Sequence, residues 1–348
     1  MKGFRDILGQ RRFSKGDIVR LLQPGNPGDE AALFARAGEV TRSFFGDGVF
    51  LRGIIEFSNY CRRDCRYCGI RRSGSAVERY RMSPEEILGT VVKIREAGIG
   101  TVVLQSGEDP QNRPEYIEKI IRMIRGKVDI AVTLSLGEYG AGVYRRWRRA
   151  GAQRYLLKFE TSDKRLYREL HPDCSYRRRW QCLKYIRDAG FQLGSGFMTG
   201  LPGQSAEMIA EDLLALHSLE PDMAGIGPFI SHPGTPMRDA RNGSPALALH
   251  VLAVARLLLR DTHLPTTTAL ETLENDSRIG GLNAGANVIM PNFTPERYKR
   301  LYEIYPDKAG STGTPEDSMQ TIVRQIAQAG KYVEKGYGHS IKKNRNIR

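Results

Sequence analysis

Three of the five cysteines in this 348-residue sequence are clustered, with Cys61, Cys65 and Cys68 forming a C-x3-C-x2-C motif. Soft thiolates select iron–sulfur clusters or zinc. A [4Fe–4S] cluster normally takes four cysteines, so three ligands leave one iron with the open site that a catalytic centre requires. Zinc would need a fourth ligand, and the nearest histidine, His171, is more than 100 residues away. The motif therefore favours a cluster over zinc or over thiols without a metal.

The other two cysteines, Cys174 and Cys182, are too few for a second cluster, and we interpret them as ordinary buried or surface thiols. The N-terminal segment lacks the continuous apolar core of a secretion signal, and clustered cysteines in a reducing compartment more often bind metal than form disulfides. No run of about 18 apolar residues predicts a membrane helix. We therefore expect a cytoplasmic protein with no membrane contact.

Three further positions favour a binding site near the cysteine motif. Gly107 follows the strand-like run 101–105, where a glycine allows close approach of the backbone to a ligand. Glu160 ends the run 154–160, and Arg179 lies in the following helix-like segment. An acid and an arginine together suit a ligand that carries both charges, because the guanidinium fork binds carboxylates in a bidentate manner.

Strand-like and helix-like segments alternate through most of the chain. The eight strand-like runs cover residues 52–57, 101–105, 130–136, 154–160, 192–198, 223–229, 264–270 and 286–291. Such alternation predicts parallel βαβ units, and eight of them fit a complete (β/α)8 TIM-type barrel in the α/β class, with a doubly wound open sheet as the rival. The cysteine motif follows the first of these strands, at the end where barrels place their active sites.

The flanking segments differ from the barrel region. Residues 1–48 predict an N-terminal helical extension, with Ser14 as the cap of a first helix and Gly46 as the end of a second. We assign residues 49–310 to the barrel and 311–348 to a C-terminal helix followed by a basic tail. Ser83, Pro84 and Glu86 predict the clearest helix start of the barrel, a capping box.

The chain is strongly basic, with 53 Lys and Arg against 39 Asp and Glu, a formal net charge of +14. Such an excess indicates nucleic acid, an anionic membrane or an acidic partner. The basic residues are spread along the chain without a basic motif interleaved with aromatics, so we expect no nucleic-acid binding. A crowded run at Arg145–Arg149 is interpreted as a solvated helix face. We expect Arg154, Lys158 and Arg179 alone to meet an anionic ligand.

At this spacing the cysteine motif resembles that of the radical S-adenosylmethionine (SAM) superfamily. The resemblance implies that SAM chelates the open iron. An electron from the reduced cluster then cleaves SAM to methionine and a 5′-deoxyadenosyl radical. It also implies that Gly107, Glu160 and Arg179 bind SAM and that Cys61, Cys65 and Cys68 hold one [4Fe–4S] cluster.

A narrower resemblance, to the HydE family of [FeFe]-hydrogenase maturases, covers roughly residues 12–310. It is carried by the runs IIEFSNYCRRDCRYCGIRR, YRMSPEEI, VLQSGEDP, AVTLSLGE, YLLKFET, GLPGQ, GIGPFISHPGTP and GANVIMPNFTP. It implies assembly of the hydrogenase H-cluster from a small sulfur- or iron–cysteine-containing substrate, with other maturases as possible partners. The implied cavity residues are Gln105, Ser106, Thr133, Arg154, Lys158, Thr267, Thr268 and Tyr305.

Two departures from that family pattern bear on the function. The stretch YPDKAGSTGTPEDSMQ contains none of the extra cysteines that many HydE proteins carry there, so we expect a single cluster. Lys158-Phe159 stands where the family pattern has Arg-His, and lysine is not equivalent to arginine at a carboxylate site. A methylornithine-synthase-like radical mutase acting on an amino acid is therefore the alternative, and a basic nucleic-acid-binding protein with a structural metal is the remote one. The electron donor would be a ferredoxin or flavodoxin.

Overall fold

Six strands pair in parallel in the order β2-β3-β4-β5-β6-β8. They belong to a computed structural model that describes residues 3–74, 77–311 and 313–342. The strands are β1 Gly48–Leu51, β2 Gly53–Ser58, β3 Thr101–Ser106, β4 Ala131–Ser135, β5 Arg154–Leu156, β6 Gln192–Ser195, β7 Met198–Thr199, β8 Met223–Ala224, β9 Gly227–Pro228, β10 Val288–Ile289 and β11 Tyr332–Glu334. The α/β class and the parallel sheet predicted from the alternation of elements are confirmed.

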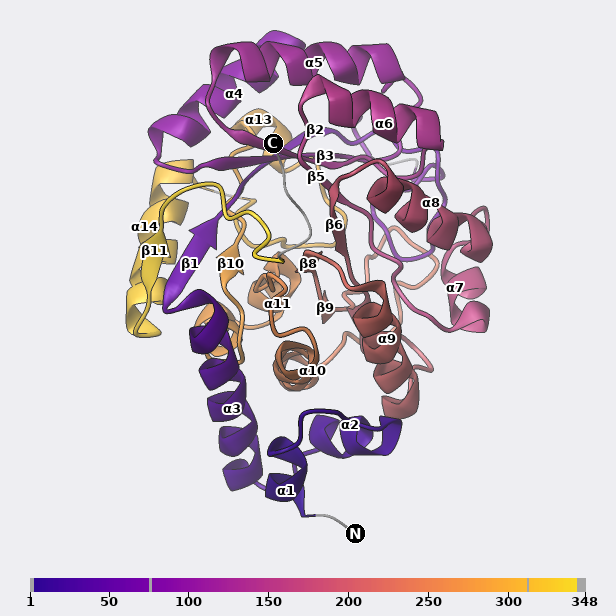
Figure 1. The fold of residues 1–348 in the computed structure, drawn as a ribbon. Helices are drawn as coiled ribbons and strands as arrows, with labels where there is room; N and C mark the ends of the chain where they lie inside the picture. The colour runs from indigo at the N-terminus through magenta and orange to yellow at the C-terminus, as the bar shows by residue number, and fades with distance from the viewer. Residues whose placement is uncertain (1–2, 75–76, 312, 343–348) are drawn as a thin grey trace.

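Isolated parallel bridges extend the pairing beyond the six-stranded sheet. They join Met223 to His263, Pro265 to Val288, and Ile54 to Asn292. The first two lead from β8 to β10, and the third leads from the chain just after β10 back to β2. Figure 1 shows the resulting arrangement, in which the strands surround the centre of the molecule and most helices lie outside them.

The predicted strand at 264–270 is wrong over its second half. The structure has only the bridges at His263 and Pro265, and helix α11 begins at Thr268. Three successive threonines favour a strand by propensity, but this preference is weak and depends on context. Thr267 stands at the N-cap of the helix instead.

The predicted strands at 192–198 and 223–229 are each interrupted at glycines. At Gly196 a Cβ atom would lie 2.0 Å from the carbonyl oxygen of Gly225, so the two chains approach too closely for a side chain. β7 and β9 then continue beyond the interruption as a separate parallel pair.

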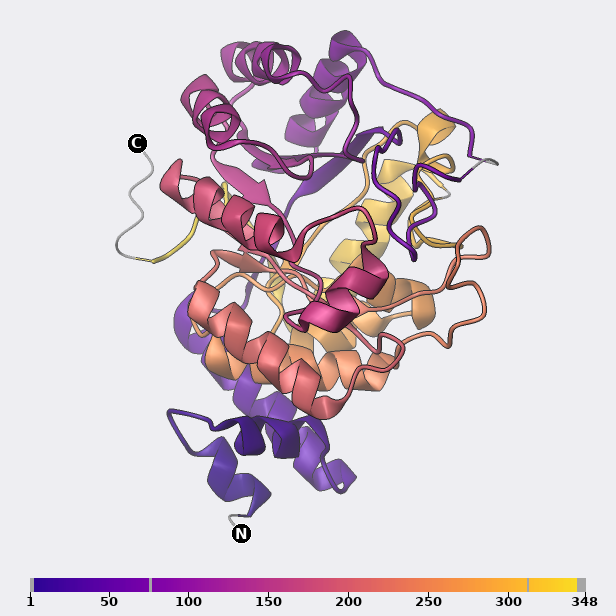
Figure 2. The same cartoon turned by 90° about the vertical axis from the view of Figure 1, so that its right-hand side faces the viewer.

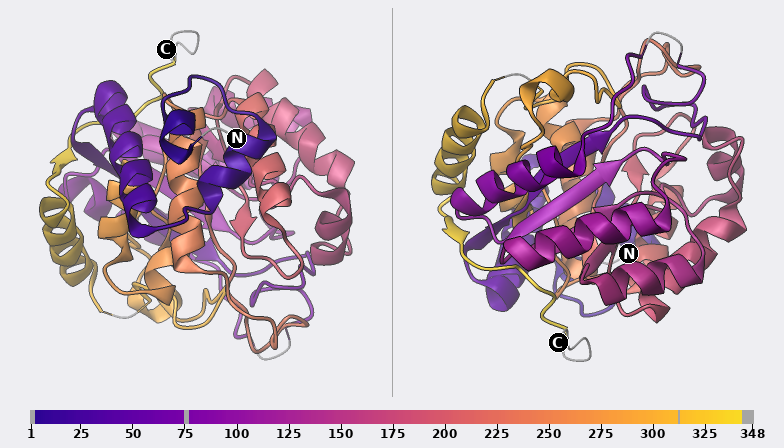
Figure 3. Two further views of the ribbon diagram at one scale, coloured as in Figure 1. Left: turned by 90° about the horizontal axis from the view of Figure 1, so that it is seen from below. Right: turned by 90° about the horizontal axis from the view of Figure 1, so that it is seen from above.

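The helices between the strands are α4 Pro84–Glu96, α5 Pro114–Lys127, α6 Ala141–Ala150, α7 Lys164–Leu170, α8 Tyr176–Asp188, α9 Ala206–Leu219, α10 Pro245–Leu258, α11 Thr268–Leu273, α12 Ser277–Asn283, α13 Glu296–Lys299 and α14 Pro315–Gln328. The capping box at Ser83 is confirmed, since its hydroxyl accepts from the Glu86 N–H at 3.2 Å while Glu86 accepts from the Ser83 N–H at 2.7 Å. Seen from above in Figure 3, α4 and α5 run alongside a strand and cover it, and the apolar stripe of each helix is buried.

Three helices precede the strands: α1 Phe4–Leu8, α2 Lys15–Leu22 and α3 Pro27–Phe45. Ser14 caps α2 through the Asp17 N–H, and α3 ends at Gly46, as predicted. These helices contact α9 and α10, and Figures 1 and 2 show them gathered at one side of the molecule. No helix in the described ranges combines the length and apolar character needed to cross a bilayer.

The described part of the predicted basic tail, residues 331–342, packs against the strands. β11 pairs in parallel with β1, and neither of these strands was predicted. Beyond β11, the carbonyl of Tyr337 accepts a hydrogen bond from Thr101 at the start of β3, so the chain crosses the amino ends of the strands. Residues 343–348 of the predicted tail lie outside the described residues.

Candidate active site

A cavity of about 760 Å3 lies at the carboxyl ends of the strands. The three motif cysteines line it together with most of the positions expected there. Those positions are Gln105, Ser106, Lys158, Glu160, Arg179, Thr267, Thr268 and Tyr305. The structure therefore brings the cysteine motif and eight predicted site residues into one space.

The cysteine loop, residues 61–69, is hydrogen-bonded to segments that follow neighbouring elements. The Arg62 N–H donates to the Glu108 carbonyl at 3.0 Å, and the Gly69 N–H donates to the Ile304 carbonyl at 3.0 Å. Gly107 packs behind the loop rather than lining the cavity, because a Cβ there would lie 2.4 Å from the Tyr60 carbonyl oxygen. The glycine thus allows the end of β3 to touch the cysteine loop.

The three thiols of the loop sit in surroundings that favour the protonated form. Burial raises the pKa of the Cys68 thiol to about 12 and also raises the pKa of Cys61. A hydrogen bond with Cys174, together with burial, raises the pKa of Cys65 well above its ordinary value. Thiols in such a place give up their protons when a metal centre binds.

Glu160 faces the cavity with a strained backbone. Its φ of +67° is in the left-handed region that non-glycine residues seldom adopt, and strain of this kind concentrates at functional sites. Its Oε2 atom is buried and has no hydrogen-bond donor among the described residues, although Lys158 Nζ lies 3.2 Å away as an ion-pair partner. A buried carboxylate oxygen with this geometry is available to a cationic ligand group.

Arg179 is held in place by Glu138, which follows β4. Arg179 Nε donates to Glu138 Oε1 at 2.7 Å, and Arg179 Nη1 donates to the Lys158 carbonyl at 2.5 Å. Glu138 Oε2 also lies 3.5 Å from Arg63, which donates to Glu108 at 2.7 Å. This network connects the cysteine loop to the arginine predicted to bind the ligand.

Tyr67, next to the last motif cysteine, is fixed by a buried histidine. Burial lowers the pKa of His171 to about 3, so the imidazole is neutral. Its Nδ1 lies 3.1 Å from the Tyr167 carbonyl and donates to it, so Nε2 accepts from the Tyr67 hydroxyl at 3.1 Å. The ring of Tyr67 is thereby held against the cavity wall.

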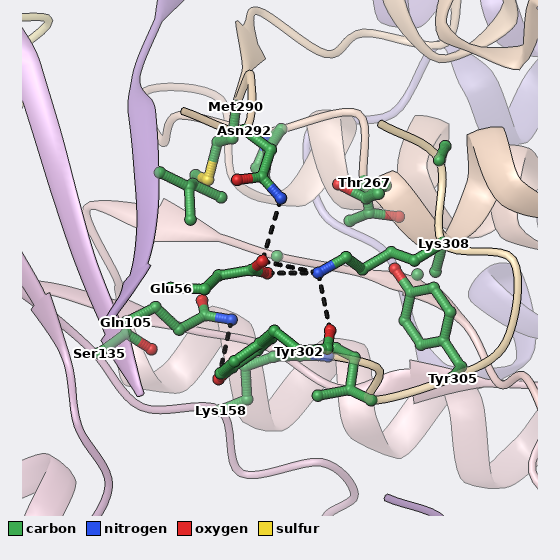
Figure 4. A pocket seen from close by; sticks show the side chains of 18 of the residues that line it. Glu56, Gln105, Ser135, Lys158, Thr267, Met290, Asn292, Tyr302, Tyr305 and Lys308 are labelled. Carbon is green, nitrogen blue, oxygen red and sulfur yellow. Dashed lines mark hydrogen bonds and ion pairs between the residues drawn. The ribbon is translucent and has the colours of Figure 1, made fainter. Parts of the chain in front are cut away.

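A second polar group lines the cavity around Glu56, as Figure 4 shows. Lys308 Nζ lies 2.7 Å from both carboxylate oxygens of Glu56 and donates to the Tyr302 carbonyl at 2.9 Å. Asn292 donates to the same carboxylate at 3.0 Å. Gln105 and Tyr302 form a long hydrogen bond of 3.5 Å nearby. Glu56 and Lys308 are almost fully buried, so the wall of the cavity carries a buried ion pair.

The expectation that Thr133 and Arg154 line this cavity is wrong. Both border a separate small cavity near the amino ends of the strands, because Arg154 begins β5 and Thr133 is its register partner in β4. Arg154 donates to Gln192 and to Thr101, each at 2.9 Å. It also donates to the Tyr337 carbonyl at 2.5 Å. Its guanidinium is therefore occupied by the strands and by the C-terminal segment.

Sequence reasoning missed Glu56, Lys308, Asn292 and Glu138. A signal existed for Glu56, which is a lone charge within the apolar run IIEF. Glu138 ends the run AVTLSLGE, one of the runs that carry the family resemblance. Lys308 and Asn292 lie in loops without a periodic pattern, so only the folded chain brings them to Glu56.

Comparison with known proteins identifies the family. The model of the radical SAM superfamily matches residues 55–216. The chain is 45% identical over 301 residues to the "[FeFe] hydrogenase maturase subunit HydE" of Thermotoga maritima, a match that covers 86% of each protein. It is 29% identical over 285 residues to a 3-methylornithine synthase of Methanosarcina acetivorans, covering 81% of this chain and 80% of the relative.

Solved structures agree with the sequence comparisons. A structure of methylornithine synthase superposes with a TM-score of 0.81 at 25% identity, over 95% of this chain and 97% of that one. The maturase HydG of Carboxydothermus hydrogenoformans superposes with a TM-score of 0.80 at 21% identity, which shows a shared fold. With the three cysteines in the cavity wall and 45% identity over most of both chains, this protein belongs to the radical SAM enzymes, in the family of the hydrogenase maturase HydE.

Proposed function

We propose that this enzyme acts in assembly of the [FeFe]-hydrogenase H-cluster, on a small sulfur- or iron–cysteine-containing substrate, with other maturases as possible partners. The observation that carries the proposal is the 45% identity to HydE over 86% of both chains. The radical SAM family uses a [4Fe–4S] cluster and SAM. When bound and reduced, the cluster supplies the electron that splits SAM into methionine and a 5′-deoxyadenosyl radical.

The donor set of this chain fits those cofactors. Cys61, Cys65 and Cys68 offer three thiolates at one end of the cavity, the number that leaves one iron open. Beside them, Glu160 presents a buried carboxylate oxygen suited to the amino group of SAM, which would share it with the ion-pair partner Lys158. Arg179, braced by Glu138, presents a guanidinium suited to a carboxylate.

The remaining cavity residues would bind and orient the substrate. Gln105, Ser106 and Lys158 line the cavity from the earlier strand positions. Thr267 and Thr268 come from the start of α11, and Tyr305 comes from the loop after α13. The Oγ1 atom of Thr267 is buried and has no hydrogen-bond partner among the described residues, so it is free to bind a polar substrate atom. Enclosure by these side chains would keep water from the reactive intermediate.

The architecture we infer for this site is a complete (β/α)8 barrel. The three isolated bridges support it, since they continue the six-stranded sheet through residues 263–265 and β10 back to β2. Helices α1 to α3 would form the N-terminal extension over residues 1–48, with the barrel at 49–310 and a C-terminal unit at 311–348. A closed barrel explains why the cysteine loop and the Glu56 group face one enclosed space.

Anaerobic reconstitution tests the cofactor assignment. One cluster predicts about four irons per chain, and about eight would show that the absent cysteines were misjudged. Cys65→Ala should abolish 5′-deoxyadenosine formation from SAM and dithionite, whereas retained activity would contradict the ligand assignment.

Genetic complementation tests the biological role. Expression of this chain in a HydE-deficient strain should restore active [FeFe]-hydrogenase. Failure, combined with normal cleavage of SAM, would favour the alternative of a radical mutase acting on an amino acid. The 0.81 TM-score with methylornithine synthase supports that alternative.

A further inference from the structure

Cys174 lies beside the cysteine loop, although more than 100 residues separate it from Cys65 in the sequence. Among the groups around Cys65, the thiol of Cys174 contributes most to raising the pKa of the Cys65 thiol. The Cys174 thiol itself donates to Asp173 Oδ1 at 3.6 Å. Cys174 stands between α7 and α8, in a segment that was not expected to approach the cluster motif. The fold therefore places a fourth cysteine beside the cysteine motif.

Hydrogen bonds outside the two cysteines hold the two segments together. The Asp64 N–H donates to Asp173 Oδ1 at 3.3 Å, and the Arg63 guanidinium donates to the Asp173 carbonyl at 3.3 Å. On the other side of Cys65, the Arg66 N–H donates to the Leu170 carbonyl at 2.9 Å. These three hydrogen bonds flank Cys65 on both sides and place the segment that carries Cys174 against it.

Cys182 provides the contrast within the same chain. It is fully buried on α8, and its thiol lies 3.5 Å from the Tyr139 carbonyl. Cys174 is only partly buried, so small oxidants reach it more readily than they reach Cys182.

We propose that Cys65 and Cys174 form a reversible disulfide when the cluster is absent, and that this disulfide blocks cluster assembly until it is reduced. The inference rests on the proposed role of Cys65 as a cluster ligand. While iron is bound, Cys65 is engaged and the pair cannot close. After cluster loss, closure would shield the ligand from irreversible oxidation and hold the protein in an inactive form.

The chemistry balances with a peroxide as oxidant. The sulfur of one cysteine attacks the peroxide, the O–O bond breaks, and a sulfenic acid and one water form. The second sulfur then displaces the oxygen of the sulfenic acid as a second water, and the S–S bond closes. Two thiols lose two electrons and two protons in total, and one peroxide becomes two waters.

Peptide mapping of the full-length, cluster-free protein tests the pairing directly. Trypsin separates all five cysteines, because Cys65 falls on the fragment 64–66 and Cys174 on 169–177. After hydrogen peroxide treatment, we expect these two fragments to be linked under non-reducing conditions in the wild type and in Cys182→Ser. They should not be linked in Cys174→Ser or in wild-type protein loaded with its cluster before treatment.

Iron uptake tests whether the disulfide blocks cluster assembly. Without a thiol reductant, reconstitution of the oxidised wild type should fall from about four irons per chain to fewer than one, and dithiothreitol should restore it. Oxidised Cys174→Ser should keep at least half of its uptake. A link from Cys65 to Cys61 or Cys68 in place of Cys174, or equal loss of uptake in Cys174→Ser, would overturn the proposal. Iron content and 5′-deoxyadenosine formation before oxidation report separately on the proposed function.

Discussion

At the scale of single residues, the site depends on side chains whose partners come from distant loops. Glu138 shows this best, since one nearly fully buried carboxylate lies within 3.5 Å of Arg63 in the cysteine loop and 2.7 Å of Arg179 on α8. Hydrogen bonds to charged groups are worth about 1.5–3 kcal/mol each. Loss of the Glu138 carboxylate would therefore leave Arg63 and Arg179 less firmly held. Glu138 thus positions Arg179, the arginine that we propose to bind SAM.

Glu138→Gln should weaken SAM binding. The amide keeps the shape of the side chain and loses the charge that orients Arg179, so we expect KM for SAM to rise by about 10- to 100-fold, with a smaller effect on kcat. Steady-state formation of 5′-deoxyadenosine measures both constants. Glu115→Gln, which removes an exposed partner of Arg146 on α5, is the matched control and should change neither. An unchanged KM in Glu138→Gln would contradict the positioning role.

Asp212 predicts a pH dependence of stability. Burial raises the pKa of this carboxyl to about 6, even though it accepts hydrogen bonds from Ser162 and Gln204. The pKa of Asp212 in the folded chain lies above the ordinary value near 4. Protonation of Asp212 therefore stabilises the folded state fully below about pH 4, and this stabilisation is lost as the pH rises through 6.

The corresponding measurement compares wild type with Asp212→Asn by denaturant unfolding of the cluster-free protein. Relative to the variant, the wild type should lose about 2 kcal/mol of unfolding free energy between pH 4 and pH 7. A difference that stays constant across this range would show that the carboxyl does not titrate in the folded chain.

At the scale of elements, close packing between loops decides the geometry of the site. The end of β3 touches the cysteine loop at Gly107, and α11 begins where the sequence favours a strand. The loop that carries Lys308 is joined to β2 by the buried pair with Glu56. Each of these contacts connects segments that are far apart in the chain.

Gly107→Ala should loosen the cluster. The added methyl would lie 2.4 Å from the Tyr60 carbonyl oxygen, so the cysteine loop has to move. We expect iron retained after desalting to fall at least twofold. Gly142→Ala in α6 meets open space and serves as the control, with unchanged iron content. Full iron retention in Gly107→Ala would show that the loop has room to adjust.

Lys308→Met should destabilise the fold by about 3–5 kcal/mol, because it leaves the Glu56 carboxylate buried without its counter-charge. Replacing both partners by methionine should recover most of that loss, since a buried ion pair adds little over apolar side chains of similar volume. Thermal or denaturant unfolding checks both variants. Lys184→Met breaks the exposed pair with Asp188 and should cost at most about 1 kcal/mol. Equal losses at both sites would contradict the account.

At the scale of the whole molecule, the exposed arginines that contribute to the net charge of +14 lie both near the cysteine motif and far from it. Arg62, Arg66 and Arg72 are exposed on the segment that carries the motif cysteines, where an electron must enter. Arg145 and Arg149 are exposed on α6, outside the cavity. An acidic donor such as a ferredoxin or flavodoxin would be attracted to the first group by complementary charge.

Charge reversal tests which of these two surfaces binds the electron donor. Arg66→Glu with Arg72→Glu should slow reduction by a flavodoxin at low ionic strength by about 10-fold or more, with little effect when dithionite is the reductant. The matched double change at Arg145 and Arg149 should leave both rates unchanged. Stopped-flow reduction at several salt concentrations measures the effect, which should fade as salt rises. Equal slowing by both double variants would argue against a specific docking surface.

The sequence by itself determined the chemistry and the class of fold. Local patterns carry this information: the spacing of Cys61, Cys65 and Cys68 defines a ligand set, and the capping box at Ser83 starts a helix. The alternation of short apolar runs with amphipathic stretches is likewise readable because burial repeats with the period of each element. The family resemblance added Glu160 and Arg179, which the structure places in the same cavity.

Only the tertiary structure decided which inward-facing residues share the cavity. Thr133 and Arg154 face inward like Gln105, but their positions along the strands place them in a different cavity, and sequence periodicity does not encode that depth. The contact between the cysteine loop and the segment that carries Cys174 likewise joins residues more than 100 positions apart. The pairing of Glu56 with Lys308 spans a still longer separation. Such contacts form only when the whole chain packs, so no local pattern of residues predicts them.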